Sequence, residues 1–436
     1  MSSQLPTDCL NEIFEHLEND TITLHSCLLY ISLSIISTLF NCLPKESKDL
    51  LHKNGICFIT LIQKPLLFNY PSFCKAISIS KINHMIENVL RSQQLITSRD
   101  LNHSELLISH EILKMFMNQI SSLKSLEHSS GYANRIKFIY SPGAKICLPN
   151  LVELKCHANI YPEFFYQILQ ICHNIQSLTI RFIDTAVISD GVTDLISLQN
   201  NLKSLTLECC NKDIIRIITP SLAKSSLTIT KLEINTYNSP LSFISMFINL
   251  QELILSLGPA EDPEDTVGRF DPKLEMVIKF LEINGKNLTK FNSSYDCKTM
   301  NLAIAKFCPN LKSINITYKN DELEALKLIL SNCQFLESIK VRIVNKSITS
   351  KNLFDILAKY SPKNFHKLII SLLPFYKLEG LQEFLIKRKN CIPRKPLSLT
   401  INTDFREDIY YLDLKAIDIY SKMGVIKEFI IITSRR

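Results

Sequence analysis

The sequence has 436 residues, of which 46% are hydrophobic, and its 49 basic and 42 acidic residues give a formal net charge of +7. This length exceeds one ordinary core, yet no Gly/Ser- or Pro-rich linker divides the chain, which favours an array of stacked units. The charge is too small to predict a nucleic-acid partner. The fourteen cysteines are widely spread, and acids occupy the place of a signal peptide's basic region, so we expect a reduced, cytoplasmic or nuclear protein.

The N-terminal residues carry an apolar pattern at spacings of three and four that starts beside a proline. Its members are Leu5, Pro6, Leu10, Ile13, Phe14 and Leu17. The pattern predicts a short amphipathic helix that begins at the proline. Residues 21–44 follow without a single charge. We interpret them as a buried helix pair and keep a membrane span as the less favoured alternative.

Further along the chain, the pattern L-x-x-L-x-L recurs, starting near residue 148. The second apolar anchors of the first copies lie 24, 27, 27 and 21 residues apart, at Leu154, Leu178, Leu205, Leu232 and Leu253. Each copy predicts a short strand, and the segments between copies have helical periodicity, as in 162–172, 301–308 and 322–330. Weaker copies continue to the C-terminus. We interpret 73–79, 123–126 and 135–139 as degenerate early copies.

These repeats resemble the leucine-rich-repeat family, and the irregular copies are most similar to those of F-box proteins. The resemblance implies an α/β fold: a leucine-rich-repeat solenoid with a curved parallel sheet and outer helices, preceded by a short all-α segment. We expect a truncated F-box-like segment over 1–44, a connecting segment over 45–72 and the solenoid over 73–436. The family's Asn or Cys after the strand is absent from most copies, and Cys210 is an exception.

The N-terminal pattern resembles the first half of an F-box, the helical module that docks substrate receptors of cullin-RING ubiquitin ligases on the Skp adaptor. The second half, with its tryptophans, is missing, because the chain contains no Trp. The resemblance implies adaptor-binding residues at Leu5, Pro6, Leu10, Ile13, Phe14, Leu17, Leu28 and Leu29.

The sequence offers no pattern typical of catalysis. It has no C-x-x-C, H-E-x-x-H, G-x-S-x-G or P-loop, so we expect no enzyme, no cofactor and no metal site. Cys172, Cys308 and Cys333 each stand three residues before a repeat anchor, which predicts buried structural thiols. The acidic segment 258–268 is interpreted as a solvated loop, with partner contact as the alternative. The basic clusters at 387–389 and 394–395 are interpreted as solvated surface, not as a nucleic-acid site.

A partner-binding surface is predicted where strand side chains alternate with the buried anchors. The predicted concave-face residues are Lys155, Thr179, Thr206, Glu233, Ile254, Asn315, Lys340, Ile369, Thr400 and Ile430. The leading hypothesis is a substrate-recruiting subunit of a Skp-cullin-F-box ligase that binds an unknown substrate protein. The alternatives are a free leucine-rich-repeat scaffold with a non-functional F-box remnant and, more weakly, a membrane-anchored repeat protein.

Overall fold

The computed structural model describes residues 21–56, 68–92, 98–128, 137–183, 188–236, 240–257, 272–293, 297–318, 323–343, 349–373, 376, 378–390, 395–403 and 414–433, and the side chains of 21–31 and 98–100 are not described. The chain forms two compact units, Met1–Leu202 and Lys203–Arg436. In each unit the strands follow chain order and pair in parallel with their sequence neighbours.

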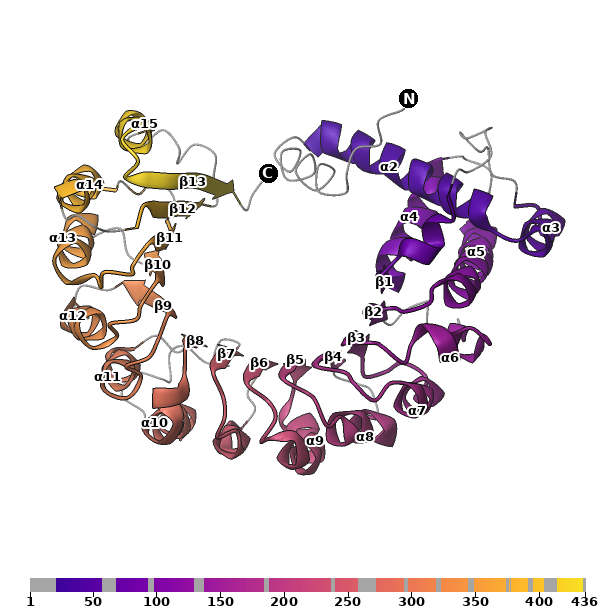
Figure 1. The fold of residues 1–436 in the computed structure, drawn as a ribbon, viewed down its shortest axis with the longest axis horizontal. Helices are drawn as coiled ribbons and strands as arrows, with labels where there is room; N and C mark the ends of the chain where they lie inside the picture. Colours follow the sequence, from indigo (N-terminus) through magenta and orange to yellow (C-terminus); the bar gives the residue numbers. More distant parts are fainter. Residues whose placement is uncertain are drawn as a thin grey trace. The chain divides into compact units, whose positions relative to one another are not determined.

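The first unit is helical at its start and repeat-like afterwards (Figure 1). Its strands are β1 (Ala76–Ser78), β2 (Ser125–His128), β3 (Glu153–His157) and β4 (Ser177–Arg181). Its helices are α2 (Thr21–Cys42), α3 (Lys45–Lys53), η1 (Tyr70–Phe73), α4 (Ile79–Ser92), α5 (Ser98–Gln119), η3 (Phe138–Tyr140), α6 (Ala144–Cys147), α7 (Pro162–Ile171) and α8 (Asp190–Leu198).

The second unit repeats strand and helix with near regularity. Its strands are β5 (Ser204–Cys210), β6 (Lys231–Thr236), β7 (Glu252–Leu257), β8 (Lys290–Ser293), β9 (Ser313–Tyr318), β10 (Ser338–Ile343), β11 (Lys367–Ser371), β12 (Leu397–Thr403) and β13 (Ile426–Thr433). Its helices are α9 (Lys212–Ser225), η4 (Ser242–Met246), α10 (Pro272–Asn284), η6 (Gly285–Asn287), α11 (Lys298–Phe307), α12 (Leu323–Asn332), α13 (Ser350–Tyr360), α14 (Leu381–Asn390) and α15 (Leu414–Lys422).

In this second unit the strands line the inner side of an arc and the helices its outer side (Figure 1). The fold is therefore the expected α/β leucine-rich-repeat solenoid, with a parallel sheet on one side and helices on the other. The strand anchors stack in register: Leu205 lies opposite Leu232, and Leu232 lies opposite Leu253. All three are fully buried, so each repeat closes the apolar core of the one before it.

A ladder of main-chain hydrogen bonds joins successive repeats at the start of each strand. The carbonyl oxygen of Lys203 accepts hydrogen bonds from the N–H groups of Thr230 and Lys231, both at 2.9 Å. The carbonyl of Thr230 accepts two N–H groups from the next repeat in the same way, from Gln251 and Glu252. Each repeat thus satisfies backbone groups of its neighbour that would otherwise be buried without partners.

Asparagine side chains add a second ladder, at a position other than the one the family pattern predicts. The Asn immediately before the first anchor donates its amide to a carbonyl of the preceding repeat. Asn249 donates to Leu227 at 2.8 Å, and Asn310 donates to Lys286 at 2.8 Å. Side-chain hydrogen bonds between these repeats therefore come from an Asn before the first anchor as well as from the position after the strand that the family pattern uses.

The N-terminal charge-free stretch forms one helix, so the prediction of a helix pair is wrong. Neither Gly nor Pro interrupts residues 21–43, and α2 ends just before Pro44 because the residue before a proline disfavours helix. Its C-terminal part packs against α4 and buries Ile36, Leu39 and Phe40. Within the part of the chain that the structure describes, none of the helices has the length and hydropathy of a membrane-spanning segment.

Two further expectations concern the early segments. Helix α3 occupies the first nine positions of the predicted connecting segment, and its Ser47 hydroxyl bonds to Glu111 of α5, a carboxylate only 3% exposed. Phe138, which the sequence suggested as a strand anchor, belongs instead to the 3-10 helix η3. It packs there against His128 and Phe164, with ring centroids 5.6 and 6.3 Å away, so it fills the core without adding a strand.

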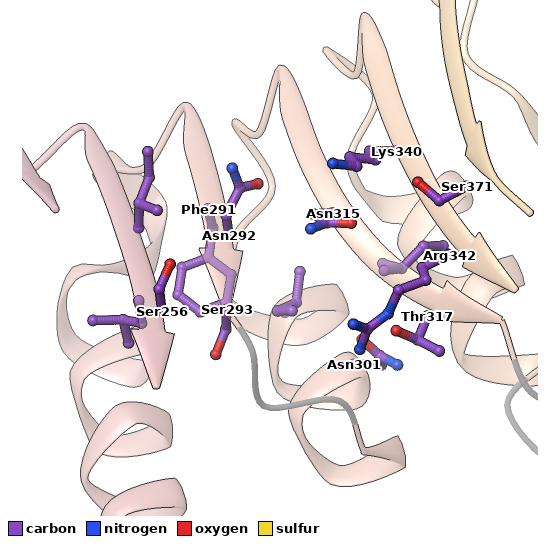
Figure 2. A pocket seen from close by; sticks show the side chains of 14 residues that line it. Ser256, Phe291, Asn292, Ser293, Asn301, Asn315, Thr317, Lys340, Arg342 and Ser371 are labelled. Atoms are coloured by element: carbon purple, nitrogen blue, oxygen red, sulfur yellow. The ribbon is translucent and has the colours of Figure 1, made fainter. Parts of the chain in front are cut away.

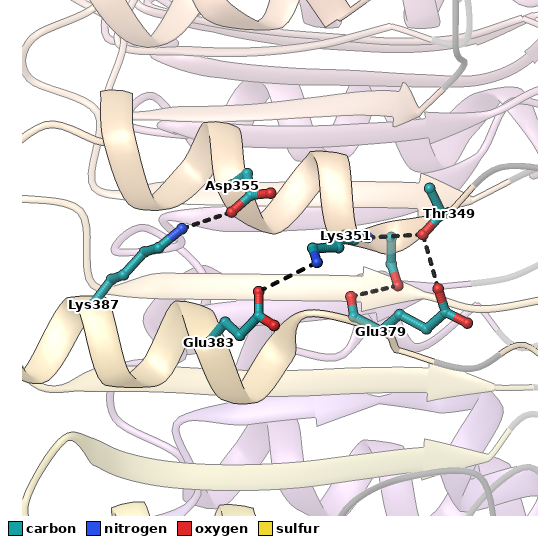
Figure 3. Close-up of polar contacts among 7 residues, drawn as sticks. Thr349, Lys351, Asp355, Glu379, Glu383 and Lys387 are labelled. Atoms are coloured by element: carbon teal, nitrogen blue, oxygen red, sulfur yellow. Dashed lines mark hydrogen bonds and ion pairs between the residues drawn. The ribbon is translucent and has the colours of Figure 1, made fainter.

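On the outer surface, polar contacts connect the helices α13 and α14 (Figure 3). Lys387 pairs with Asp355 at 2.7 Å, and Lys351 approaches Glu383 at 3.9 Å. All four side chains are about half exposed, so these ion pairs contribute little to stability. The apolar anchors and the backbone ladder, not these surface pairs, hold adjacent repeats together.

Candidate functional site

The candidate site is the sheet surface opposite the helices, which we call the open face. Strand register aligns the predicted residues there in columns across neighbouring strands. In the first unit Lys155 lies opposite Thr179. In the second unit Thr206, Glu233 and Ile254 lie on consecutive strands, and so do Asn315, Lys340, Ile369, Thr400 and Ile430. The register thus aligns these ten residues with one another across the strands, and their role in binding a partner stays a prediction.

Sequence reasoning missed further members of these columns, among them Glu127 and Asn292. Glu127 of β2 lies opposite Lys155, and Asn292 of β8 lies opposite Ile254. Both directly follow a repeat anchor, Leu126 and Phe291 respectively, so the same alternation rule could have found them. The short, irregular copies in which they lie concealed this signal.

The exposed fraction of the side chain varies strongly among the predicted open-face residues of the second unit. Ile430 is 39% exposed, whereas Thr400 is only 8% exposed. Ile254 and Ile369 are half-buried. The isoleucines of β7 and β11 are therefore partly covered by their neighbours, and the exposed apolar surface in this column lies on the last strand, β13.

Charged residues on the open face are partly paired, within one strand in the first unit and between two strands in the second. Glu153 lies 3.1 Å from the ammonium of Lys155, and its carboxylate accepts a hydrogen bond from the Ser125 hydroxyl at 2.7 Å. The Ser125 hydroxyl, and then Lys155, lower the pKa of Glu153 below its usual value. In the second unit Glu252 and Lys290 face each other at 3.8 Å.

A hollow of about 300 Å³ opens on the face of β7 to β11, at the carboxyl ends of these strands. Figure 2 shows Lys340 and Arg342 of β10 on one side of it, with Asn292 and Asn315 on the neighbouring strands. Asn301 of α11 and the hydroxyls of Ser256, Thr317 and Ser371 complete its polar lining. The hollow thus presents two cations together with amide and hydroxyl hydrogen-bond donors.

The three cysteines that recur in phase with the repeats are packed into the core. Cys172, Cys308 and Cys333 are fully buried, as their phase in the repeats predicts. The Cys172 thiol donates to the Leu148 carbonyl at 3.2 Å, and burial raises the pKa of this thiol to about 12. A thiol with so high a pKa carries almost no thiolate at neutral pH and is a poor nucleophile or metal ligand.

Among the described side chains, no cluster of three His, Cys, Asp or Glu residues is placed to hold a metal ion. His157 lies beside Arg181 on the open face of the first unit, where burial and then Arg181 lower the pKa of its imidazole.

The predicted adaptor-binding residues lie mostly outside the described residues. Leu5, Pro6, Leu10, Ile13, Phe14 and Leu17 fall in 1–20, and the acidic segment 258–268 also lies outside. Leu28 and Leu29 belong to α2, although their side chains are not described.

Comparison with known proteins gives distant likenesses among solved structures only. No family model matches the chain, and no curated protein matches it. Among solved structures it is similar to a chain of the crystal structure of the Rad7 and Elc1 complex in yeast. The two are 13% identical, the match covers 100% of this chain and 94% of that chain, and the TM-score is 0.47. A likeness at this level defines no family. The fold and the open face by themselves define a leucine-rich-repeat solenoid.

Proposed function

We propose that the chain is the substrate-recruiting subunit of a Skp-cullin-F-box type ubiquitin ligase. In this role the N-terminal segment docks on a Skp-type adaptor, and the open face binds a substrate protein. The chain supplies proximity and performs no chemistry of its own, and it needs neither a cofactor nor a metal. Such a receptor acts in the cytoplasm or the nucleus, because the ligase does.

The observation that carries the receptor half of this proposal is the register of the open face. From β5 to β13, alternate residues point away from the helices while the intervening anchors are buried. A broad surface of varied polar and apolar side chains suits the binding of a protein better than the conversion of a small substrate.

The adaptor half rests on the sequence resemblance of residues 5–29 to an F-box. If the module does not bind an adaptor, the open face remains available, and the chain is then a free leucine-rich-repeat scaffold. The two proposals differ in one measurable property, which is adaptor binding by the N-terminal segment.

The test keeps the chain intact, because removing residues 1–44 would strip from α4 the buried contacts of Ile36 and Phe40. Purified full-length chain is titrated with a purified Skp-type adaptor by biolayer interferometry. Ile13→Asp combined with Phe14→Asp should weaken binding by about thirtyfold, the effect of losing about 2 kcal/mol at an apolar hot spot. Asn11→Asp combined with His16→Asp introduces the same charge at polar positions and should bind as the unaltered chain does.

Two outcomes would contradict the ligase proposal. Either the unaltered chain fails to bind the adaptor, or the Ile13/Phe14 variant binds as tightly as the Asn11/His16 variant. In either case the scaffold alternative is favoured.

A further inference from the structure

Two cysteines of the first unit differ from the buried thiols described above. Cys42 is the last residue of α2, Cys74 directly follows η1, and both are half-buried free thiols. Helix α2 packs against η1, so the two residues come together although the chain between them is long. An oxidant can reach a partly exposed thiol, whereas it cannot reach one in the core. Cys42 and Cys74 are therefore candidates for oxidation.

Both sulfurs contact the main chain of the same residue, Tyr70 of η1. The Cys74 thiol donates to the Tyr70 carbonyl oxygen at 3.9 Å. Burial raises the pKa of the Cys42 thiol, and the Lys48 ammonium and a main-chain hydrogen bond at Tyr70 oppose this effect. The charge of a Cys74 thiolate would also act on Cys42, so the two sulfurs lie within electrostatic range of each other. Side-chain rotation with a shift of the short η1 turn could then bring them to bonding distance.

A cation lies beside Cys42. The Lys48 ammonium donates to the carbonyl oxygen of Asn41 at 2.8 Å, next to the residue that precedes Cys42 in the chain. Its charge stabilises a Cys42 thiolate against the effect of burial, whereas burial raises the pKa of Cys74. Because the thiolate is the nucleophile, we expect Cys42 to react first and Cys74 second.

The other neighbouring cysteines in the described part of the chain are less suited to oxidation. These pairs are Cys147 with Cys172, Cys308 with Cys333, and Cys209 with Cys210. In the first two pairs both side chains are fully buried, so they are shielded from an oxidant. In the third pair the residues are adjacent in the sequence, which does not suit an ordinary disulfide.

We propose that Cys42 and Cys74 form a reversible disulfide when the chain meets hydrogen peroxide, and that this bond fastens the end of α2 to η1. The Cys42 thiolate attacks a peroxide oxygen, the O–O bond breaks, and hydroxide leaves a Cys42 sulfenic acid. The Cys74 thiolate then attacks the Cys42 sulfur, so that the S–S bond forms, the S–O bond breaks and hydroxide leaves again. The protons of the two thiols convert both hydroxides to water. Two thiols thus lose two electrons, and one peroxide gains them.

The bond would add a covalent link where only non-covalent contacts now hold α2. The end of α2 is attached through buried side chains such as Ile36 and Phe40, which pack against α4. A cross-link between positions 42 and 74 restricts the unfolded chain and so favours the docked helix. In a reducing compartment the disulfide would persist only while the oxidant is present. The attachment of α2 would then depend on the level of peroxide, whether or not the ligase proposal holds.

The test exposes the full chain to hydrogen peroxide at pH 8, blocks the remaining thiols with N-ethylmaleimide and digests the chain with chymotrypsin. This protease cuts after Phe40 and Phe73, so Cys42 and Cys74 fall in different peptides. Mass spectrometry should detect these two peptides linked to each other, and dithiothreitol should separate them. Cys297→Ser, at another half-buried cysteine, is the matched control and should leave the yield unchanged.

Single variants test the order of the reaction. In Cys74→Ser the second thiol is absent, so peroxide should leave a Cys42 sulfenic acid that dimedone labels. In Cys42→Ser, labelling of Cys74 should be about tenfold lower. An unfolded chain would expose buried thiols such as Cys172 to dimedone as well, so selective labelling shows that the variant is folded.

A second pair of variants tests the cation. Lys48→Gln should slow formation of the disulfide about threefold, because the Cys42 thiolate loses a neighbouring positive charge. Lys53→Gln makes the same change at an exposed position of α3 and should leave the rate unaltered. Equal rates in the two variants would contradict the assignment of Cys42 as the first thiol to react.

Hydrogen–deuterium exchange tests the structural consequence. In the oxidised chain the amides of residues 36–42 should exchange about tenfold more slowly than in the reduced chain, while those of β5 and β6 should not change. Three results would overturn the inference: no linked peptide after peroxide treatment, preferential linkage of Cys42 or Cys74 to a different cysteine, or unchanged exchange at the end of α2. Adaptor binding is measured separately, so these outcomes leave the ligase proposal undecided.

Discussion

Arg388 of α14 is a buried cation whose removal should destabilise the C-terminal repeats. Its side chain is 4% exposed, and its Nη2 donates to the carbonyls of Phe365 at 2.6 Å and Lys395 at 2.7 Å. The guanidinium also lies 5.7 Å from the centroid of the Phe365 ring. It thus connects the end of α14 to the turns that precede β11 and β12.

The size of the stability loss expected on replacing Arg388 follows from two opposing effects. Hydrogen bonds from a charged donor are worth about 1.5–3 kcal/mol each, so the two bonds contribute about 3–6 kcal/mol. Burying the charge costs several kcal/mol, which offsets part of this gain. Arg388→Met keeps much of the apolar stem but leaves two carbonyls without this donor, so we expect a net loss of about 2 kcal/mol. Arg388→Lys should lose about as much, because one ammonium cannot reproduce the planar fork.

Hydrogen–deuterium exchange is the appropriate assay, because long repeat arrays need not unfold in one step. In Arg388→Met, the amides of α14 and β12 should exchange about thirtyfold faster, while those of β5 and β6 should not change. Lys389→Met, at an exposed neighbouring position, is the control and should change protection very little. Unchanged or slower exchange in Arg388→Met would refute the reasoning, since the buried charge would then not stabilise the fold.

Three other predictions test the packing and the titration of single groups. Gly285→Ala should destabilise the α10–α11 contact by about 2 kcal/mol or more in urea unfolding, because its Cβ would come within 2.7 Å of a carbonyl oxygen at the end of α11; wild-type stability would contradict this packing. Burial raises the pKa of the Cys308 thiol, so iodoacetamide at pH 8 should label the half-buried Cys297 first, and equal rates would be contrary to expectation. NMR titration should place the pKa of His157 below 6.5, and Arg181→Gln should raise it. Because the folded-state pKa of His157 is lowered, its contribution to stability is complete above pH 6.5 and declines as the pH falls through the folded pKa; an unshifted titration would argue against this environment.

The repeat architecture could be predicted because its signal lies in the spacing of apolar residues. Leu154, Leu178 and Leu205 are strand anchors whose inward direction follows from simple alternation. The same alternation placed Lys340 and Ile369 on the open face. Where a copy is short or irregular, as at Leu126 and Phe138, sequence alone does not distinguish a strand from a helical turn.

The hollow on the open face could not be predicted in the same way. It depends on the lateral register of β7 to β11, which brings Ser256 and Ser371 to the same opening although 115 positions separate them in the sequence. Arg388 illustrates a different limit. It lies between Lys387 and Lys389 in a basic cluster interpreted as solvated surface, and that interpretation is wrong for Arg388. Helical geometry turns it to the same side as Phe384, which is also buried, and its Nη2 donates to two nearby carbonyls.

The main-chain carbonyls of Lys203 and Thr230 each accept two N–H groups from the next repeat. This arrangement affects how the chain can gain or lose repeats over evolution. Within the described residues, each such carbonyl accepts its two main-chain hydrogen bonds from the repeat directly after it, and each strand pairs with its sequence neighbours. A duplicated or deleted repeat would therefore recreate the same junction between new neighbours, without disturbing distant partners. The length of the binding surface can thus change in whole-repeat steps, whereas losing part of a repeat would break two junctions at once.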